Sequence, residues 1–300
     1  MSKAIVTGGA GFIGSNLVDR ILPLYNEVIV IDNESSDAHE SFYWNKKCSN
    51  HKLDICDYKK IRPLFDGVEV VFHVAAEARI QPTIKNPILA ATTNVVGTCT
   101  VLQCAREAGV KRVVYSSTSS AYGLKNEIPL AETMSNDCLN PYSVTKTSGE
   151  ELCRIYTKLF GLETVIFRYF NVYGERHPLK GQYAPVIGIF LRQKNNNEPM
   201  TIVGTGEQRR DFTHVSDVVS ANILASILEN KAPVGETINI GTGSNHSILE
   251  IAEYIGGQYK FIESRLGEAK ETQANIGKAF KILGWSPTIK VEDWIKSYES

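Results

Sequence analysis

The first strand-like run of the chain ends in a glycine-rich turn, and this turn constrains the fold more than any other feature. Lys3-Ala4-Ile5-Val6-Thr7 is followed by Gly8-Gly9-Ala10-Gly11-Phe12-Ile13-Gly14 and then by an amphipathic stretch. Glycine permits a tight turn with positive φ, close approach of a ligand to the backbone, and close packing of a helix on its strand. The helix that follows would direct its N-terminus at a phosphate. This layout predicts a dinucleotide site.

A carboxylate at the end of the next apolar run indicates which dinucleotide is bound. Val28-Ile29-Val30-Ile31 ends in Asp32, eighteen residues after Gly14. That separation is close to the one at which an acidic side chain meets the hydroxyls of the adenine ribose. Because Asp32 would repel a 2′-phosphate, the sequence favours NAD over NADP. A glycine turn of purely conformational origin is the alternative interpretation.

Composition excludes several classes of partner. The 300 residues are 43% hydrophobic with a net charge of −1, so the chain can bury a large core and has no basic excess suited to nucleic acid or a membrane. A core strand that starts near Ala4 leaves no room for a signal peptide, and no apolar run approaches a membrane span. We therefore expect a cytoplasmic protein that acts on a small molecule. The six cysteines and six histidines lack metal-ligand spacing, which predicts reduced thiols and no metal site.

Short β-branched runs alternate with longer helical patterns through the first half of the chain. Helical patterns cover Ile88 to Ala108 and Tyr142 to Phe160, and strand-like runs cover Val70 to His73, Arg112 to Ser116 and Thr164 to Arg168. This alternation predicts an α/β fold of the Rossmann type. In such a fold a doubly wound parallel sheet has helices on both faces, and ligands bind at the carboxyl ends of the strands.

Beyond residue 170 the alternation loosens, and glycine, proline and short strands become common. We expect residues 1–170 to form an NAD-binding Rossmann domain that is rejoined by strands and helices around 210–242. Residues 171–300 would mainly form a smaller mixed α/β region that binds the substrate. The run Thr237-Ile238-Asn239-Ile240 is predicted to add one more strand to the sheet, so the two regions would interleave.

Two side chains at the start of a predicted helix supply a candidate base. Tyr142 and Lys146 are four residues apart and share a helix face. The preceding strand ends in Ser116-Ser117-Thr118-Ser119-Ser120, which brings hydroxyl groups to the ligand edge of the sheet. A second pair with the same spacing, Tyr43 and Lys47, follows no strand end, and we interpret Tyr43 as a loop residue.

A tyrosine needs a lowered pKa to act as a base near neutral pH. Moving the pKa from about 10 to about 7 requires roughly 4 kcal/mol. A positive charge at about 6 Å contributes on the order of 3 kcal/mol at an effective dielectric of about 20. Lys146 and an oxidised nicotinamide ring would together suffice, so the cofactor would help to create the base.

Taken together, these features resemble the extended short-chain dehydrogenase/reductase family, and within it the NAD-dependent nucleotide-sugar 4-epimerases. The likeness extends over nearly the whole chain. It also rests on Asp32-Asn33, Leu53-Asp54-Ile55, His73-Val74-Ala75-Ala76, Asn94-Val95-Val96-Gly97-Thr98, Arg168 to Gly174, Arg210 to Val215 and Leu283-Gly284-Trp285.

The resemblance implies a set of site residues. The catalytic residues would be Thr118, Tyr142 and Lys146. NAD would be bound by Gly8, Gly11, Phe12, Ile13, Gly14, Asp32, Asn33, Asp54, Ile55, Ala75, Ala76, Asn94, Ser116, Tyr142, Lys146 and Tyr169. The nucleotide sugar would be bound by Ser117, Thr118, Asn171, Val186, Arg210, Arg265 and Thr272.

The resemblance also implies a reaction. In that family a tyrosinate removes the proton of the sugar 4-hydroxyl while hydride passes from C4 to NAD, and the 4-keto sugar turns over before hydride returns to its other face. Relatives that dehydrate the sugar carry acidic residues directly after the catalytic hydroxyl, and decarboxylating relatives place a glutamate in that loop; this chain has Ser119 and Ser120 there. Glucuronate epimerases tend to have threonine in place of Asn171 and then an Arg-Pro-Asp run, where this chain reads Glu175-Arg176-His177-Pro178.

Two further positions bear on the sugar. Gly181-Gln182-Tyr183-Ala184-Pro185-Val186-Ile187 resembles the uridine-contacting segment of UDP-N-acetylglucosamine epimerases, although Gly188 stands where proline is common. Thr272 falls where a bulky tyrosine excludes N-acetyl groups in glucose-restricted members. We therefore expect an isomerase that interconverts UDP-GlcNAc and UDP-GalNAc, and possible substrates include UDP-glucose and UDP-galactose.

Several alternatives stay open at this point. They are a UDP-glucuronate 4-epimerase, a dehydratase or reductase of a nucleotide sugar, and a protein that binds NAD and a nucleotide sugar without turnover.

The helical segments Pro87 to Ala108 and Tyr142 to Leu159 resemble the pair that forms a four-helix interface in this family. The resemblance therefore implies a homodimer.

Overall fold

The central element of the fold is a parallel sheet. The computed structural model describes residues 2–179, 185–228, 234–263 and 269–298, and within these ranges seven strands pair in the order β11-β6-β5-β4-β1-β2-β3, all of them parallel. The strands are β1 (Lys3–Thr7), β2 (Glu27–Asp32), β3 (Ser49–Lys52), β4 (Val70–His73), β5 (Arg112–Thr118), β6 (Glu163–Tyr169) and β11 (Glu236–Ile240). This topology confirms the predicted Rossmann-type fold.

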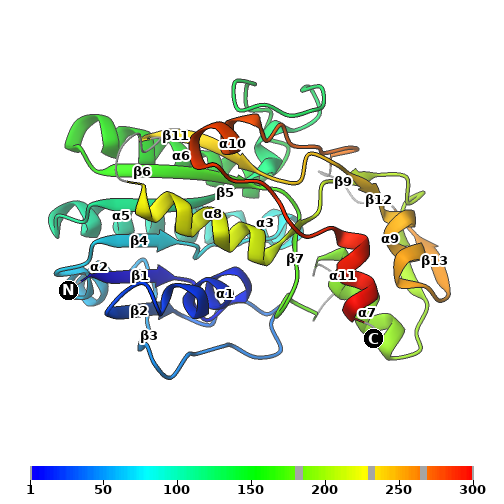
Figure 1. Ribbon diagram of the computed structural model, residues 1–300, viewed down its shortest axis with the longest axis horizontal. Helices are drawn as coiled ribbons and strands as arrows, with labels where there is room; N and C mark the ends of the chain where they lie inside the picture. Colours follow the sequence, from blue (N-terminus) through cyan, green and yellow to red (C-terminus); the bar gives the residue numbers. More distant parts are fainter. Residues whose placement is uncertain (1, 180–184, 229–233, 264–268, 299–300) are drawn as a thin grey trace.

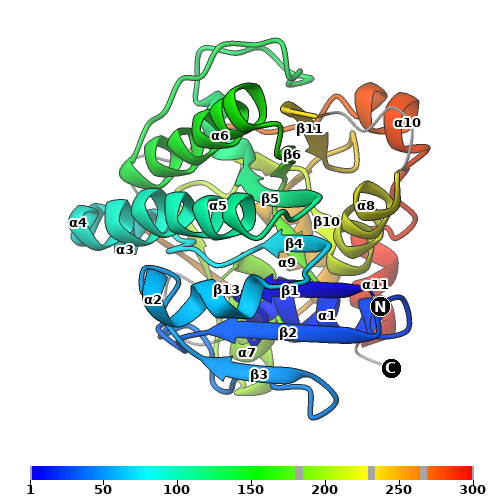
Figure 2. The same ribbon diagram turned by 90° about the vertical axis from the view of Figure 1, so that its left-hand side faces the viewer.

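Helices cover both faces of the sheet, as Figure 2 shows. One face packs against α1 (Phe12–Ile21), α8 (Val215–Ile227) and α10 (Gly277–Leu283). The other packs against α2 (Tyr58–Ile61), α5 (Thr98–Glu107) and α6 (Pro141–Phe160). Alternate residues of a strand enter opposite cores: Val114 lies in the first, and Val113 and Tyr115 lie in the second. Such two-sided burial explains why the strands read as continuous apolar runs.

A smaller region lies beyond the carboxyl ends of the strands, to the right in Figure 1. It contains α7 (Val186–Asn195), α9 (Ile248–Ile255), α11 (Val291–Tyr298) and the parallel pair β8 (Met200–Val203) and β13 (Tyr259–Ile262). Two short pairs complete it: β7 (Val172–Tyr173) with β10 (Thr213–His214), and β9 (Arg209–Arg210) with β12 (His246–Ser247). A separate apolar core holds these elements together.

Two elements differ from the sequence-based expectations. Strand β3 has the sequence Ser-Asn-His-Lys, and its polar residues gave no strand signal because it is an edge strand paired only with β2. The helix expected at Ile88 to Ala108 consists of α4 (Pro87–Ala91), a π-helical turn at Thr92–Gly97, and α5. A shorter helix, α3 (Ile80–Lys85), precedes it.

The expectation that no apolar run approaches the length of a membrane span needs one correction, in the stretch from α4 through α5. Pro87–Glu107 is long and apolar enough to cross a bilayer, judged by length and composition alone. However, 44% of its most apolar window is buried inside the structure, and the stretch packs against α6. The core helix of a globular domain meets the same criterion, so the observation is weak evidence for a membrane segment.

The strand order places the ligand crevice. Chain connections leave β1 toward β2 on one side and β4 toward β5 on the other, so the order reverses between β1 and β4. Ligands of doubly wound sheets bind at this switch point. Gly8, with φ +68°, turns the chain there, and a Cβ at this position would lie 2.7 Å from the Ala75 nitrogen at the end of β4.

Candidate functional site

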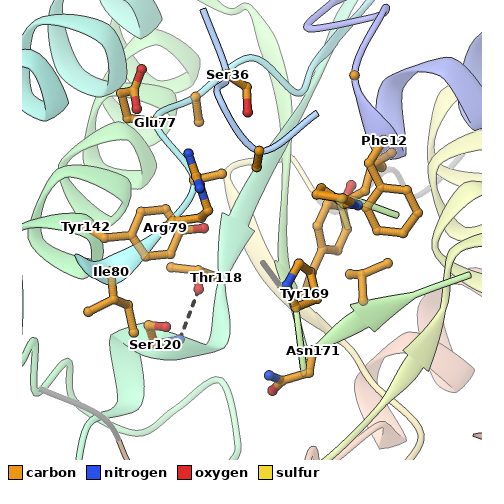
Figure 3. Close-up of a pocket in the computed structure, with 18 of the residues that line it drawn as sticks. Phe12, Ser36, Glu77, Arg79, Ile80, Thr118, Ser120, Tyr142, Tyr169 and Asn171 are labelled. Atoms are coloured by element: carbon orange, nitrogen blue, oxygen red, sulfur yellow. Dashed lines mark hydrogen bonds between the residues drawn. The ribbon is translucent and has the colours of Figure 1, made fainter. Parts of the chain in front are cut away.

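One cavity of about 540 Å³ extends from the glycine turn to the smaller region. Its walls come from the carboxyl ends of β1, β2, β4 and β5 and from the smaller region. Figure 3 shows Phe12 and Tyr169 on one side, Tyr142 and Thr118 on the other, and Asn171 at the lower end. The cavity therefore has one end at the predicted cofactor residues and one at the predicted substrate residues.

The glycine turn is shaped to receive a dinucleotide. Gly14 stands in the first turn of α1, where a Cβ would lie 2.1 Å from the Gly8 carbonyl oxygen. Gly11 borders the cavity and has no side chain to cover its backbone. A Cβ built at this position would lie 3.4 Å from its nearest neighbour, the Gly8 carbonyl oxygen. A pyrophosphate can thus approach the N-terminus of α1, and these residues fit NAD.

The carboxylate expected to meet the adenine ribose is fixed in place. Asp32 ends β2 and borders the cavity. Its Oδ2 accepts from the Ala10 N–H at 3.1 Å and its Oδ1 from the Glu34 N–H at 2.8 Å. Burial raises the pKa of Asp32, and these backbone donors oppose the shift. Beside it, Asn33 Nδ2 donates to Asp54 Oδ2 at 3.0 Å, and Ile55 lines the cavity.

Helix α6 starts where it presents Tyr142 to the cavity. The Asn140 side chain accepts from the Ser143 N–H at 2.9 Å and Pro141 occupies the first turn, which together fix the helix start. Across from it, Thr118 ends β5, and its Oγ1 accepts from the Ser120 N–H at 3.1 Å (Figure 3). Thr118 and Tyr142 both line the cavity, and the Thr118 hydroxyl is close enough to lower the pKa of Tyr142. The structure thus brings the two predicted hydroxyls together.

Burial changes the electrostatic argument made from the sequence. Burial raises the pKa of Tyr142, and the nearby Thr118 hydroxyl lowers it in part. Lys146, only 2% exposed, places its Nζ 4.3 Å from the centre of the Tyr115 ring. Burial lowers the pKa of Lys146 to about 7. Desolvation opposes the charged form of both groups, so a charged Lys146 depends on the groups around it.

Among the predicted site residues that the structure describes, four do not line the cavity: Asp54, Asn94, Ser116 and Lys146. Asn94 accepts from the Glu77 N–H at 2.8 Å, and its Nδ2 donates to the Glu77 carbonyl at 3.1 Å, so it fixes the loop after β4. Ser116 Oγ donates to Tyr169 Oη at 3.1 Å. Asn94 and Ser116 therefore support the wall residues Glu77 and Tyr169 from behind.

Most of the predicted substrate residues lie at the far end of the cavity. Asn171, Val186, Arg210 and Thr272 all line it. Arg210 Nη1 donates to the carbonyls of Arg209 and Lys270 at 2.9 and 3.3 Å, and Thr272 Oγ1 accepts from the Asp211 N–H at 3.4 Å. Ser117 also borders the cavity, but its hydroxyl donates to Glu150 instead. Arg265 and residues 181–184 lie outside the described residues.

Part of the cavity wall comes from a segment that the sequence did not indicate. The segment after β2 folds back over the glycine turn, and the Tyr43 N–H donates to the Ala10 carbonyl at 2.8 Å. Within this segment His39 lines the cavity with its Nε2 near Gly11, and Asp37 forms an ion pair with Arg79 from the loop after β4. No periodic pattern marks these residues, although their place after strand ends could have indicated them.

Comparison with known proteins shows the family to which the chain belongs. The model of the NAD dependent epimerase/dehydratase family matches residues 4–241. The UDP-glucose 4-epimerase of Thermotoga maritima, solved with UDP-glucose, is 33% identical, with a TM-score of 0.91 and coverage of 98% of this chain and 96% of that one. A UDP-N-acetylglucosamine 4-epimerase from Methanobrevibacter ruminantium is 30% identical, with a TM-score of 0.90 and coverage of 98% and 96%.

A third similar structure contains the cofactor. The UDP-glucuronic acid 4-epimerase from Bacillus cereus, in complex with UDP-glucuronic acid and NAD, is 31% identical, with a TM-score of 0.86 and coverage of 98% of this chain and 96% of that one. These likenesses span the cofactor end and the substrate end of the cavity alike. The chain therefore belongs to the NAD dependent epimerase/dehydratase family, and its cofactor is NAD.

Proposed function

We propose that this chain catalyses the 4-epimerisation of a UDP-sugar with NAD held in the cavity. The observation that carries the proposal is the Thr118–Tyr142 hydroxyl pair, which faces the cavity beside the glycine turn. Bound NAD supplies the acceptor and donor of hydride. Tyr142 takes the proton of the sugar 4-hydroxyl and later returns it, while Thr118 holds the sugar oxygen by a hydrogen bond.

The residues after Thr118 favour epimerisation over elimination. Ser119 and Ser120 both line the cavity, and neither can act as the acid or base that loss of water requires. The loop after β7 reads Glu175-Arg176-His177-Pro178 and lacks the Arg-Pro-Asp run expected of a glucuronate epimerase. A neutral UDP-hexose is therefore the preferred substrate class.

We propose UDP-GlcNAc and UDP-GalNAc as the substrate pair, with UDP-glucose and UDP-galactose as a second pair. Support comes from Thr272, a small side chain on the cavity wall at the position where a tyrosine would exclude an N-acetyl group. Similar structures include epimerases named for glucose, for N-acetylglucosamine and for glucuronic acid, so similarity alone does not choose among the sugars.

A panel of UDP-sugars tests both levels of the proposal. The protein is incubated with each sugar without added NAD, and the epimers are resolved chromatographically. We expect conversion of the N-acetylated pair without net accumulation of NADH. A reductase would stall, and a binding protein would convert nothing. Tyr142→Phe should abolish turnover while bound NAD is retained, and an active variant would exclude Tyr142 as the base.

We also propose that the protein is a homodimer. The continuous helical stretch of α4, the π-helical turn and α5 packs beside α6 (Figure 2). Exposed apolar side chains on these helices are Ile88, Leu89, Val96, Val144, Ile155, Leu159 and Phe160. Ile88 is 78% exposed, which suits contact with a second copy better than contact with water. A sedimentation mass of one chain at micromolar concentration would refute the dimer. The cytoplasmic location stays a prediction.

A further inference from the structure

A fully buried carboxylate lies behind the catalytic wall. Glu150 in α6 has no exposed surface, and its Oε1 accepts from Ser117 Oγ at 2.6 Å and from Arg168 Nε at 2.8 Å. Its Oε2 accepts from Arg168 Nη2 at 2.8 Å and from Arg154 Nη2 at 3.3 Å. Ser117 and Arg168 are opposite each other on β5 and β6. Glu150 therefore ties α6 to the ends of two strands.

The same carboxylate is placed to act on the catalytic lysine. Tyr142, Lys146 and Glu150 follow one another at intervals of four residues, on one face of α6. The ionisable groups that face Lys146 are His73 from β4, Tyr115 from β5, and Tyr142, Glu150 and Cys153 from α6. Burial lowers the pKa of His73 to about 3 and raises the pKa of Tyr115 and of Cys153. Among these groups Glu150 therefore supplies the negative charge.

Two arginines share the charge of Glu150: buried Arg168 and partly exposed Arg154, which also pairs with Glu151. Arg168 is only 3% exposed and stays protonated because guanidinium does not lose its proton in proteins. Its charge cancels that of Glu150, so Lys146 meets a nearly neutral pair. Arg168 and Lys146 both adjoin Glu150. Without the carboxylate, these two buried cations would lose their shared counter-ion, and Lys146 is the one that can release a proton.

We propose that Glu150 is a positioning residue for the reaction, which keeps Lys146 protonated by cancelling the charge of Arg168 and fixes the strand end that carries Thr118. The proposal rests on the proposed function for the role of Tyr142 as the base. Its physical content is independent of turnover, because Lys146 lies four residues from Tyr142 on the same helix face whether or not a sugar is bound.

The test is a titration of Tyr142 in the NAD-loaded protein. The phenolate is followed by ultraviolet difference absorbance between each protein and its Tyr142→Phe counterpart. We expect Glu150→Gln, which keeps the shape of the side chain, to weaken proton release from Tyr142 about tenfold. Glu150→Gln with Arg168→Met removes both charges and should restore the wild-type titration. Glu27→Gln, which changes a partly exposed carboxylate paired with Lys3 at the start of β1, is the control and should change nothing.

Each outcome bears on the proposal. A wild-type titration in Glu150→Gln would overturn it. Equal shifts in the single and double variants would also overturn it, because that result indicates a role in packing and not in charge balance. Should Glu150→Gln fail to fold, the double variant and Arg168→Met alone still decide: Arg168→Met should strengthen proton release from Tyr142, since it leaves Glu150 unopposed. If no UDP-sugar is converted by the wild type, the proposed function fails, and the titration still stands or falls separately.

Discussion

Two substitutions in the glycine turn separate the needs of the fold from those of the cofactor. At Gly14 an added methyl group would meet the backbone of Gly8 at 2.1 Å and of Gly9 at 2.8 Å, and backbone atoms cannot move aside cheaply. Overpacking of this kind costs about 1–3 kcal/mol. At Gly11 the nearest atom would be 3.4 Å away, and φ is −81°, so alanine fits the protein without strain. The methyl group would instead occupy space that the cofactor needs.

The two variants should therefore fail in different ways. Without NAD, Gly14→Ala should melt about 2–5 °C below the wild type for a chain of this length, whereas Gly11→Ala should melt within about 1 °C of it. In calorimetric titrations with NAD, Gly11→Ala should raise the dissociation constant about 5- to 150-fold, the equivalent of about 1–3 kcal/mol. Wild-type NAD affinity in Gly11→Ala would refute the placement of the pyrophosphate. An unchanged melting temperature in Gly14→Ala would refute the close packing of α1.

Three further predictions concern other parts of the site. Burial lowers the pKa of His73 to about 3, below the unfolded value of about 6.5. The neutral imidazole therefore contributes up to about 5 kcal/mol to the free energy of unfolding above about pH 6.5. This contribution is lost as the pH falls toward about 3. In urea titrations His73→Asn should therefore lose less stability than the wild type between these pH values, and parallel losses would contradict the reasoning. Arg79→Ala and Asp37→Ala should each speed NAD release two- to fivefold, the range expected for loss of an exposed ion pair. Slower NAD release from Asp37→Ala would contradict this, because it would show that the negative charge of Asp37 repels the NAD phosphates more than its ion pair with Arg79 holds the site closed. Thr272→Tyr should lower kcat/KM for UDP-GlcNAc at least tenfold more than for UDP-glucose, and an equal effect on both sugars would remove Thr272 as a determinant of specificity.

The sequence predicted those parts of the molecule where local pattern and ligand chemistry coincide. A recognisable strand or helix pattern stands beside each of three chemical signals. They are the glycine turn, the Asp32 carboxylate and the Tyr142–Lys146 spacing. Strand β3 gave no such signal, because an edge strand with polar side chains needs only its partner strand. The ion pair between Asp37 and Arg79 also escaped, since it joins loops after two different strands.

Desolvation was the other quantity that the sequence could not supply. The spacing of Tyr142 and Lys146 is visible in the sequence, and so is the position of Glu150 four residues further on. What the sequence lacks is the depth at which α6 lies against β5. That depth sets the direction of the pKa shifts of Tyr142 and Lys146, and it depends on packing among segments far apart in the chain.

The last strand of the sheet has a consequence for how the protein can be divided. Strand β11 pairs with β6, and α8 and α10 cover one face of the sheet, although all three follow the first segments of the smaller region in the chain. A fragment cut after residue 170 would leave β6 as an unprotected edge and would expose apolar surface that α8 and α10 now cover. Such a fragment should aggregate, so cofactor and sugar binding cannot be assigned by expressing the two ends of the chain separately. They have to be separated by point substitution within the intact protein.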